Sequence, residues 1–117
     1  MTYSFLGPDP LETQVHAVLA RLAAGEPPNL IERRQVDVKE EPGRRGAGGQ
    51  IRADGDRSEP AARYLASEMS CMANSPGGGA IILGVADDGT RIGTNLDGEW
   101  LRHRIWQLTD GRLTIAV

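Results

Sequence analysis

The sequence predicts a single α+β domain in which helices pack on a mostly antiparallel sheet. Hydrophobic residues recur at helical spacing in some segments and alternate in others, which indicates both helices and strands. The wholly apolar run over residues 80–86 suits the centre of a sheet. The chain has 117 residues and no internal repeat, which is the length of one ordinary domain. We therefore expect one core.

The composition excludes several classes of protein. The hydrophobic content of 39% and charged content of 25% are typical of a globular chain, and they argue against disorder end to end. The longest apolar run is far below the ~20 residues that cross a bilayer, and the first ten residues lack the features of a secretory signal. Cys71 is the only cysteine, so neither an internal disulfide nor a zinc site is expected. These features predict a cytoplasmic protein without a membrane partner.

The first 28 residues are expected to form an N-terminal helical segment, followed by the main domain over residues 29–117. Asp9 and Pro10 are typical of a helix start, and Gly25 with the prolines at 27–28 is typical of a helix end. One apolar stripe runs along this helix and consists of Leu11, Val15, Val18, Leu19 and Leu22.

Residues 35–39 alternate in the manner of a half-buried strand, with Val36 and Val38 on one face. The next segment, residues 42–59, holds five glycines and four arginines but only one large apolar residue, Ile51. An insertion of this composition offers too little apolar surface for a packed element, so we expect it to be mobile in the free protein.

The second half of the chain predicts two helices and three strands. Ser58 is suited to cap a helix that ends near Asn74, and the second helix is expected over residues 97–108. The run 80–85 is expected to be a central strand, joined by the tight turn at Asp88-Gly89 to an antiparallel strand over residues 90–93. Residues 112–117 alternate again and predict a further strand, which led us to expect the front part of a longer protein.

Two segments carry a recognisable motif. The first contains Glu32 and then Asp37-Val38-Lys39. The second contains Asn74-Ser75-Pro76-Gly77-Gly78 and, after the apolar run, Gly84-Val85-Ala86-Asp87-Asp88-Gly89. Together these segments resemble the Schlafen-type, divergent Alba-like domain over roughly residues 31–108. The family commonly has Glu at the position of Asp37. Its members usually have a shorter insertion than residues 42–59 of this chain.

The resemblance implies two kinds of function. In bacterial transcriptional regulators the domain is regarded as a nucleic-acid binder, and this implies DNA more than RNA. In vertebrate Schlafens, duplicated copies form a cleft that cuts RNA with carboxylates at this motif. Carried over to this chain, the catalytic and metal-binding residues of such a ribonuclease are Glu32, Asp37 and Asp87. Clustered carboxylates can hold Mg²⁺ or Mn²⁺, which would be cofactors only in that alternative.

Non-catalytic nucleic-acid binding is the function that we predict, with basic side chains on phosphates and little reading of bases. The residues expected to contact phosphates are Arg33, Arg34, Lys39, Arg44, Arg45, Arg52 and Arg57. Because one copy offers half of the cleft of the duplicated relatives, a homodimer is also expected. The net charge of −3 keeps a third possibility open, a protein-interaction module without nucleic-acid binding.

Overall fold

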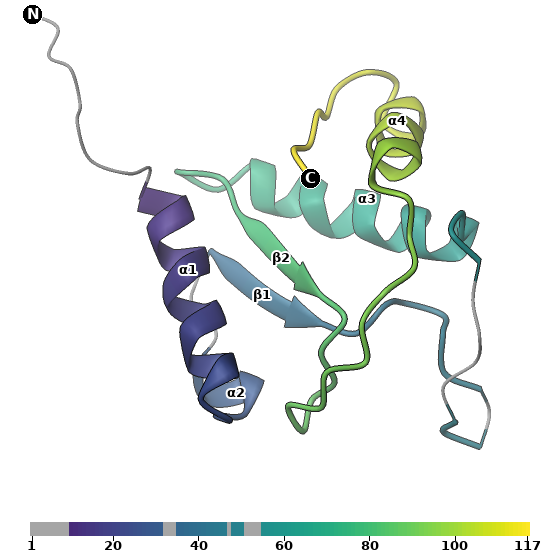
Figure 1. The fold of residues 1–117 in the computed structure, drawn as a ribbon. Coiled ribbons are helices and arrows are strands. Elements are labelled where there is room, and N and C mark those ends of the chain that lie inside the picture. Colours follow the sequence, from purple (N-terminus) through teal and green to yellow (C-terminus); the bar gives the residue numbers. More distant parts are fainter. Residues whose placement is uncertain (1–9, 32–34, 47, 51–54) are drawn as a thin grey trace, which may run out of the picture.

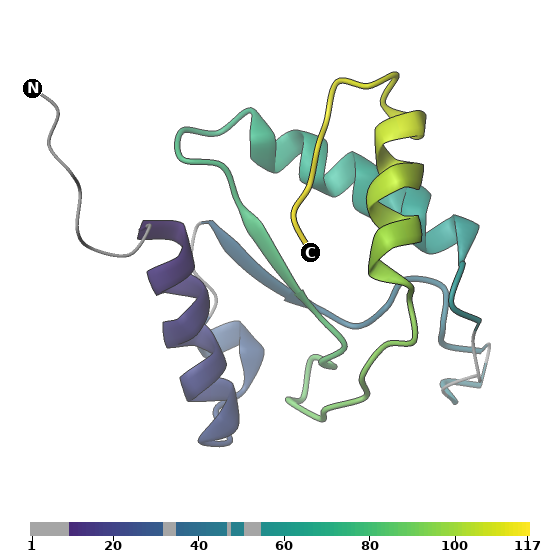
Figure 2. The same ribbon diagram turned by 45° about the horizontal axis from the view of Figure 1, so that its top comes forward.

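The computed structural model describes residues 10–31, 35–46, 48–50 and 55–117, and its elements alternate between helix and strand (Figure 1). In chain order they are α1 (Pro10–Ala23), α2 (Pro28–Ile31), β1 (Val36–Lys39), α3 (Glu59–Ala73), β2 (Ala80–Leu83) and α4 (Gly98–Leu108). The two strands form one sheet, with α1 on one face and α3 and α4 on the other (Figures 1 and 2). The α+β class predicted from the sequence is therefore confirmed.

The direction of the sheet corrects the prediction of a mostly antiparallel arrangement. β1 and β2 pair in parallel, with a register that runs from Val36 opposite Ala80 to Lys39 opposite Leu83. Between them, α3 carries the chain back to the end of the sheet where β1 began, and such a crossover is what parallel neighbours require. Within the described residues β2 pairs with β1 alone, and all four of its residues are only half-buried. The expected central strand is thus an edge strand in this part of the chain.

Two further strand predictions are wrong. The turn at Asp88-Gly89 forms, but the segment after it makes only an isolated antiparallel bridge, between Val85 and Arg91. Residues 112–117 contain no strand. Their alternation instead reflects the packing of Leu113 and Ile115 against the cluster beneath α3 and α4.

The pleat of the strands divides the apolar side chains into two clusters. Val36 and Val38 are buried on the α1 face, where they pack with residues of α1 and with Val85. On the opposite face, Ile81 and Leu83 pack with α3 and α4. The predicted cap Ser58 is confirmed for α3, and Asp97, which was not predicted as a cap, caps α4. Asp9, expected at the start of the first helix, lies outside the described residues. None of the helices in the described ranges combines the length and hydropathy of a membrane span.

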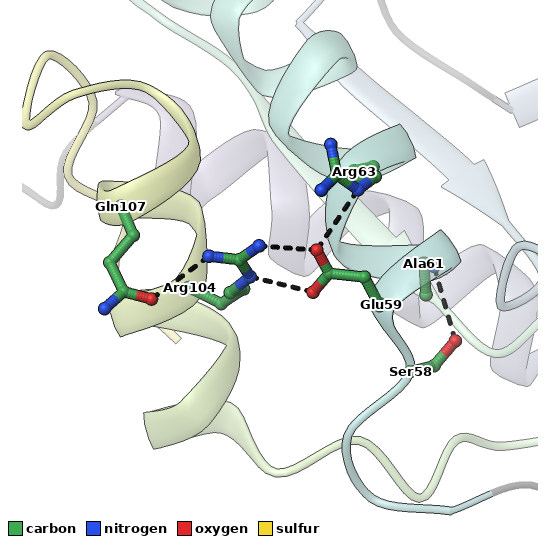
Figure 3. A network of polar contacts seen from close by, with 6 residues as sticks. All are labelled: Ser58, Glu59, Ala61, Arg63, Arg104 and Gln107. Carbon is green, nitrogen blue, oxygen red and sulfur yellow. Dashed lines mark hydrogen bonds and ion pairs between the residues drawn. The ribbon is translucent and has the colours of Figure 1, made fainter.

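An ion-pair network fastens the start of α3 to α4 (Figure 3). Nε and Nη2 of Arg104 donate to the two carboxylate oxygens of Glu59 at 2.8 and 2.6 Å, a bidentate geometry. Arg63 lies 3.1 Å from the same carboxylate, and Gln107 accepts from Arg104. The hydrogen bonds and charge of Arg104, together with Arg63, outweigh desolvation and lower the pKa of Glu59.

We predict that Glu59→Gln destabilises the domain near neutral pH. A carboxyl whose pKa is lowered by folding contributes stability above its unfolded pKa, about 4.3, and that contribution is lost as the pH falls through the folded pKa. Urea unfolding should therefore show a lower midpoint for the variant at neutral pH and a shrinking difference below about pH 4. The control is Glu99→Gln, which removes an exposed pair with Arg102 within one helix and should change little. Equal midpoints for Glu59→Gln and the parent protein at neutral pH would contradict the prediction.

Candidate functional site

Parallel pairing brings both motif segments to the same edge of the sheet. The carboxyl end of β1 leads into residues 39–46, and the carboxyl end of β2 leads into residues 84–94. We name these two segments the carboxyl-edge surface; in Figures 1 and 2 the chain after β1 runs to the right and the loop after β2 lies at the bottom. In open sheets with parallel strands, ligands bind beyond the carboxyl ends of the strands. This edge is therefore the place where motif residues from both halves of the chain can act together.

Hydrogen bonds join the two segments of the carboxyl-edge surface. The carbonyl oxygen of Lys39 accepts from the backbone N–H groups of Gly84 and Val85 at 2.7 and 3.1 Å. Further along, Nη1 of Arg44 donates to the carbonyl oxygen of Gly93 at 2.9 Å. These bonds cross from one segment to the other, so the surface is held as one unit.

Glu41 is a buried member of this junction that was not among the site residues expected from the sequence. Its side chain is 1% exposed, and Oε1 accepts from the hydroxyl of Thr94 at 2.5 Å. A buried carboxylate needs such partners, because desolvation without them is costly. No local pattern marks Glu41, since the partner lies on a segment more than fifty positions away. It is a positioning residue for the surface.

Gly84 fixes the bend at which β2 becomes the turn. Its φ is +104°, and a Cβ placed there would lie 2.9 Å from the Cα and carbonyl carbon of Gly93. The carbonyl oxygen of Gly84 accepts from the N–H groups of Ile92 and Gly93, each at 2.8 Å. Only glycine tolerates both this conformation and this approach of two backbones. The motif glycine is therefore explained by the construction of the turn.

The structure describes four of the seven predicted phosphate-contacting residues. Lys39 lies 2.7 Å from Oδ2 of Asp37 and over the ring of Tyr64. Burial acts to lower the pKa of Lys39, but the hydrogen bond and charge of Asp37, with Tyr64 and Glu68, outweigh it and raise that pKa. Nε of Arg45 lies 2.8 Å from Glu40. Arg33, Arg34 and Arg52 lie outside the described residues.

Arg91 belongs to the carboxyl-edge surface, although the sequence analysis did not select it. It lies in the turn segment, is exposed, and forms no ion pair with any residue that the structure describes. The position of Arg91 in the sequence gives no sign of this role, because only the parallel pairing places the turn beside the end of the first strand. Arg57 is also exposed and precedes the cap of α3, outside the surface.

The predicted metal-binding carboxylates are not seen as a cluster. Asp37 lies opposite Ile81 in the ladder, its carboxylate pairs with Lys39, and it also accepts from the backbone N–H of Val38 at 3.0 Å. Asp87 follows β2 in the turn and is exposed. Glu32 lies outside the described residues. In the part of the chain that is described, no three His, Cys, Asp or Glu side chains gather in a way that could hold a metal ion.

Asp88 has a structural role in the turn. Its carboxylate accepts from the backbone N–H of Thr90 at 2.9 Å, and this bond and the Thr90 hydroxyl are the main causes that lower the pKa of Asp88. The positive charge of Arg45 contributes in the same direction. Asp88 thus faces back into its own turn, as is common for aspartate before glycine.

Residues 32–114 match the family model described as Schlafen, AlbA_2. The chain belongs to this family. The match contains both motif segments and the carboxyl-edge surface that joins them. Membership identifies a nucleic-acid-related domain, and the resemblance inferred from the sequence is confirmed.

A solved structure with a similar fold is that of the DIP2311 protein from Corynebacterium diphtheriae. It has a TM-score of 0.67 and 44% sequence identity to this AlbA_2 domain over 83% of the chain. The match spans only 20% of the DIP2311 chain, so it concerns one part of that protein. No curated protein matches the chain.

We predict that Gly84→Ala destabilises the domain by about 2–5 kcal/mol, the sum of left-handed strain and overpacking against Gly93. The matched control is Gly25→Ala, at a φ of +89° with no atom within 4 Å of the added Cβ. That variant should lose only the strain, about 1–2 kcal/mol. Free energies of unfolding from urea titration measure both. Equal losses for the two variants would show that the approach of Gly84 to Gly93 is unimportant.

Proposed function

We propose that this AlbA_2 domain binds nucleic acid, DNA in preference to RNA, through the carboxyl-edge surface, as the nucleic-acid-binding domain of a bacterial transcriptional regulator. The observation that carries the proposal is the parallel pairing of β1 and β2. It brings Arg44 and Arg45 of one segment to the same edge as Arg91 of the other. Family membership supports the same class of ligand.

The charges of the surface balance, so we expect binding to phosphates to be weak and sensitive to salt. The surface carries four positive charges, on Lys39, Arg44, Arg45 and Arg91. It also carries four carboxylates, those of Glu40, Glu41, Asp87 and Asp88. Two of these carboxylates are engaged internally: Glu41 is buried beside Thr94, and Asp88 faces the backbone of its turn. The guanidinium groups of Arg45 and Arg91 remain at the surface.

The Arg45–Glu40 pair does not prevent phosphate binding. The two side chains are 44% and 28% exposed, and ion pairs in such positions are worth about 0–1 kcal/mol. A phosphate can offer Arg45 a bidentate contact of the kind that guanidinium groups favour. Since exchange of one weak partner for another costs little, non-specific affinity in the range of roughly 10⁻⁴–10⁻⁶ M is expected at physiological salt.

The alternative function is a ribonuclease that uses Glu32, Asp37 and Asp87 with Mg²⁺ or Mn²⁺. Incubation of the protein with structured RNA distinguishes this activity from binding alone. Cleavage that requires the metal ion and disappears in Asp37→Ala would replace the present proposal.

The homodimer stays a prediction. Sedimentation of the free domain measures its oligomeric state and so tests it. Absence of DNA and RNA binding even at low salt would leave the protein-interaction alternative.

We predict that Arg45→Gln and Arg91→Gln each weaken binding to duplex DNA and reduce the slope of log K against log salt by about one. Each variant removes one phosphate contact, and the loss should be similar for unrelated DNA sequences because phosphates carry no sequence information. Fluorescence anisotropy of labelled duplexes across a salt series measures both quantities.

Arg21→Gln is the matched control, because Arg21 lies on α1, pairs with Glu26 and belongs to neither segment of the carboxyl-edge surface. This variant should keep the parental slope. If Arg21→Gln lowers the slope as much as the two test variants do, binding does not depend on the carboxyl-edge surface.

A further inference from the structure

The outer face of α4 carries an aromatic pair that neither the core nor the carboxyl-edge surface uses. The rings of His103 and Trp106 stack with centroids 6.1 Å apart and planes inclined by 14°. Trp106 is 48% exposed and His103 is also exposed. The whole chain contains only two tryptophans, and the other, Trp100, packs against the cluster beneath α3 and α4. An exposed tryptophan in a chain this poor in aromatic residues therefore calls for a function.

The turn after α4 holds the indole in position. The backbone N–H of Gly111 donates to the carbonyl oxygen of Trp106 at 2.8 Å. Gly111 has a φ of +75°, and a Cβ at this position would lie 3.2 Å from the indole ring. Because the turn restrains the indole while Trp106 remains 48% exposed, the ring needs little reordering to accept a planar partner, which favours binding.

Two arginines lie near the pair in the sequence, together with the carboxylates of Glu99 and Asp110. Arg102 precedes His103 on α4, and its partner Glu99 is 79% exposed, so that pair is weak. Arg112, in the turn that supports Trp106, is exposed and has no ion pair among the residues that the structure describes. Flat aromatic rings, with the guanidinium groups of Arg102 and Arg112 nearby in the sequence, match the two parts of a nucleotide, a base that stacks and a phosphate that is negative.

The position of α4 links this face to the carboxyl-edge surface. Thr94 ends that surface and α4 begins four residues later, at Gly98. From there, Trp106 lies eight residues along the helix, a rise of about 12 Å. A strand that binds at the carboxyl edge would have to span this segment and the first turns of α4 to reach the pair.

We propose that His103 and Trp106 form a stacking platform for unpaired bases, so that this domain prefers single-stranded nucleic acid, or duplex with an unpaired segment, over fully paired duplex. The inference rests on the proposed function and names the form of nucleic acid. In a duplex the bases stack on one another and are inaccessible to rings on a helix surface, whereas bases of a single strand are free to stack on them.

The test uses Trp100→Phe as background, so that Trp106 is the only tryptophan that emits. A short oligothymidylate and a duplex of equal length are titrated at low salt, with Trp106 emission and anisotropy of the labelled nucleic acid as readouts. The single strand should quench Trp106, and the duplex should not. Trp106→Leu should weaken binding of the single strand by about tenfold, the effect of losing one stacked base, and leave duplex affinity unchanged. Leu19→Ala, which trims another exposed apolar side chain on α1, should change neither.

The outcomes separate the two proposals. If both nucleic acids bind while emission and the Trp106→Leu affinities stay unchanged, the platform is overturned and the proposed function stands. If neither binds at low salt, the proposed function fails and the platform with it. If Trp106→Leu instead converts a sedimenting dimer into a monomer without changing binding, the pair is a contact between copies and the platform is overturned.

Discussion

The architecture depends on the parallel ladder between β1 and β2. Because these strands run in the same direction, the segments that follow them emerge at one edge, and α3 must cross the sheet to connect them. If the strands were antiparallel, the two motif segments, Asp37-Val38-Lys39 and Gly84-Val85, would lie at opposite edges of the sheet. The bonds from Gly84 and Val85 to the Lys39 carbonyl close the junction, and the proposed phosphate contacts follow from it.

Local features of the fold were predictable because they depend on neighbours in sequence. The cap Ser58 satisfies an N–H group three residues ahead, and burial of Val36 and Val38 follows from the period of a strand. Strand direction was not predictable, since it depends on how α3 returns the chain. The alternation of residues 112–117 was misleading for a related reason: packing of Leu113 and Ile115 beneath two helices imposes the same period as pairing in a sheet.

The same distinction holds for the candidate site. Arg44 and Arg45 could be selected from sequence because they lie close to the first strand. Arg91 is placed at the same edge only by the parallel pairing, and the buried Glu41 gains its role through its contact with Thr94. Asp37 illustrates the opposite case. Its motif position implies a metal ligand, yet its carboxylate pairs with Lys39 and accepts from the N–H of Val38, which would otherwise lie at the outer edge of β1. A residue type in a motif therefore indicates where chemistry is possible, and the partners decide which chemistry occurs.

Amide-resolved NMR of the isotopically labelled domain, titrated with duplex DNA of arbitrary sequence at low salt, tests the central claim most directly. The account predicts chemical-shift changes confined mainly to residues 39–46 and 84–94, in both segments at the same DNA concentration, because one edge carries both. Changes centred on α1, or changes in only one of the two segments, would contradict the claim that the parallel ladder assembles a single binding surface.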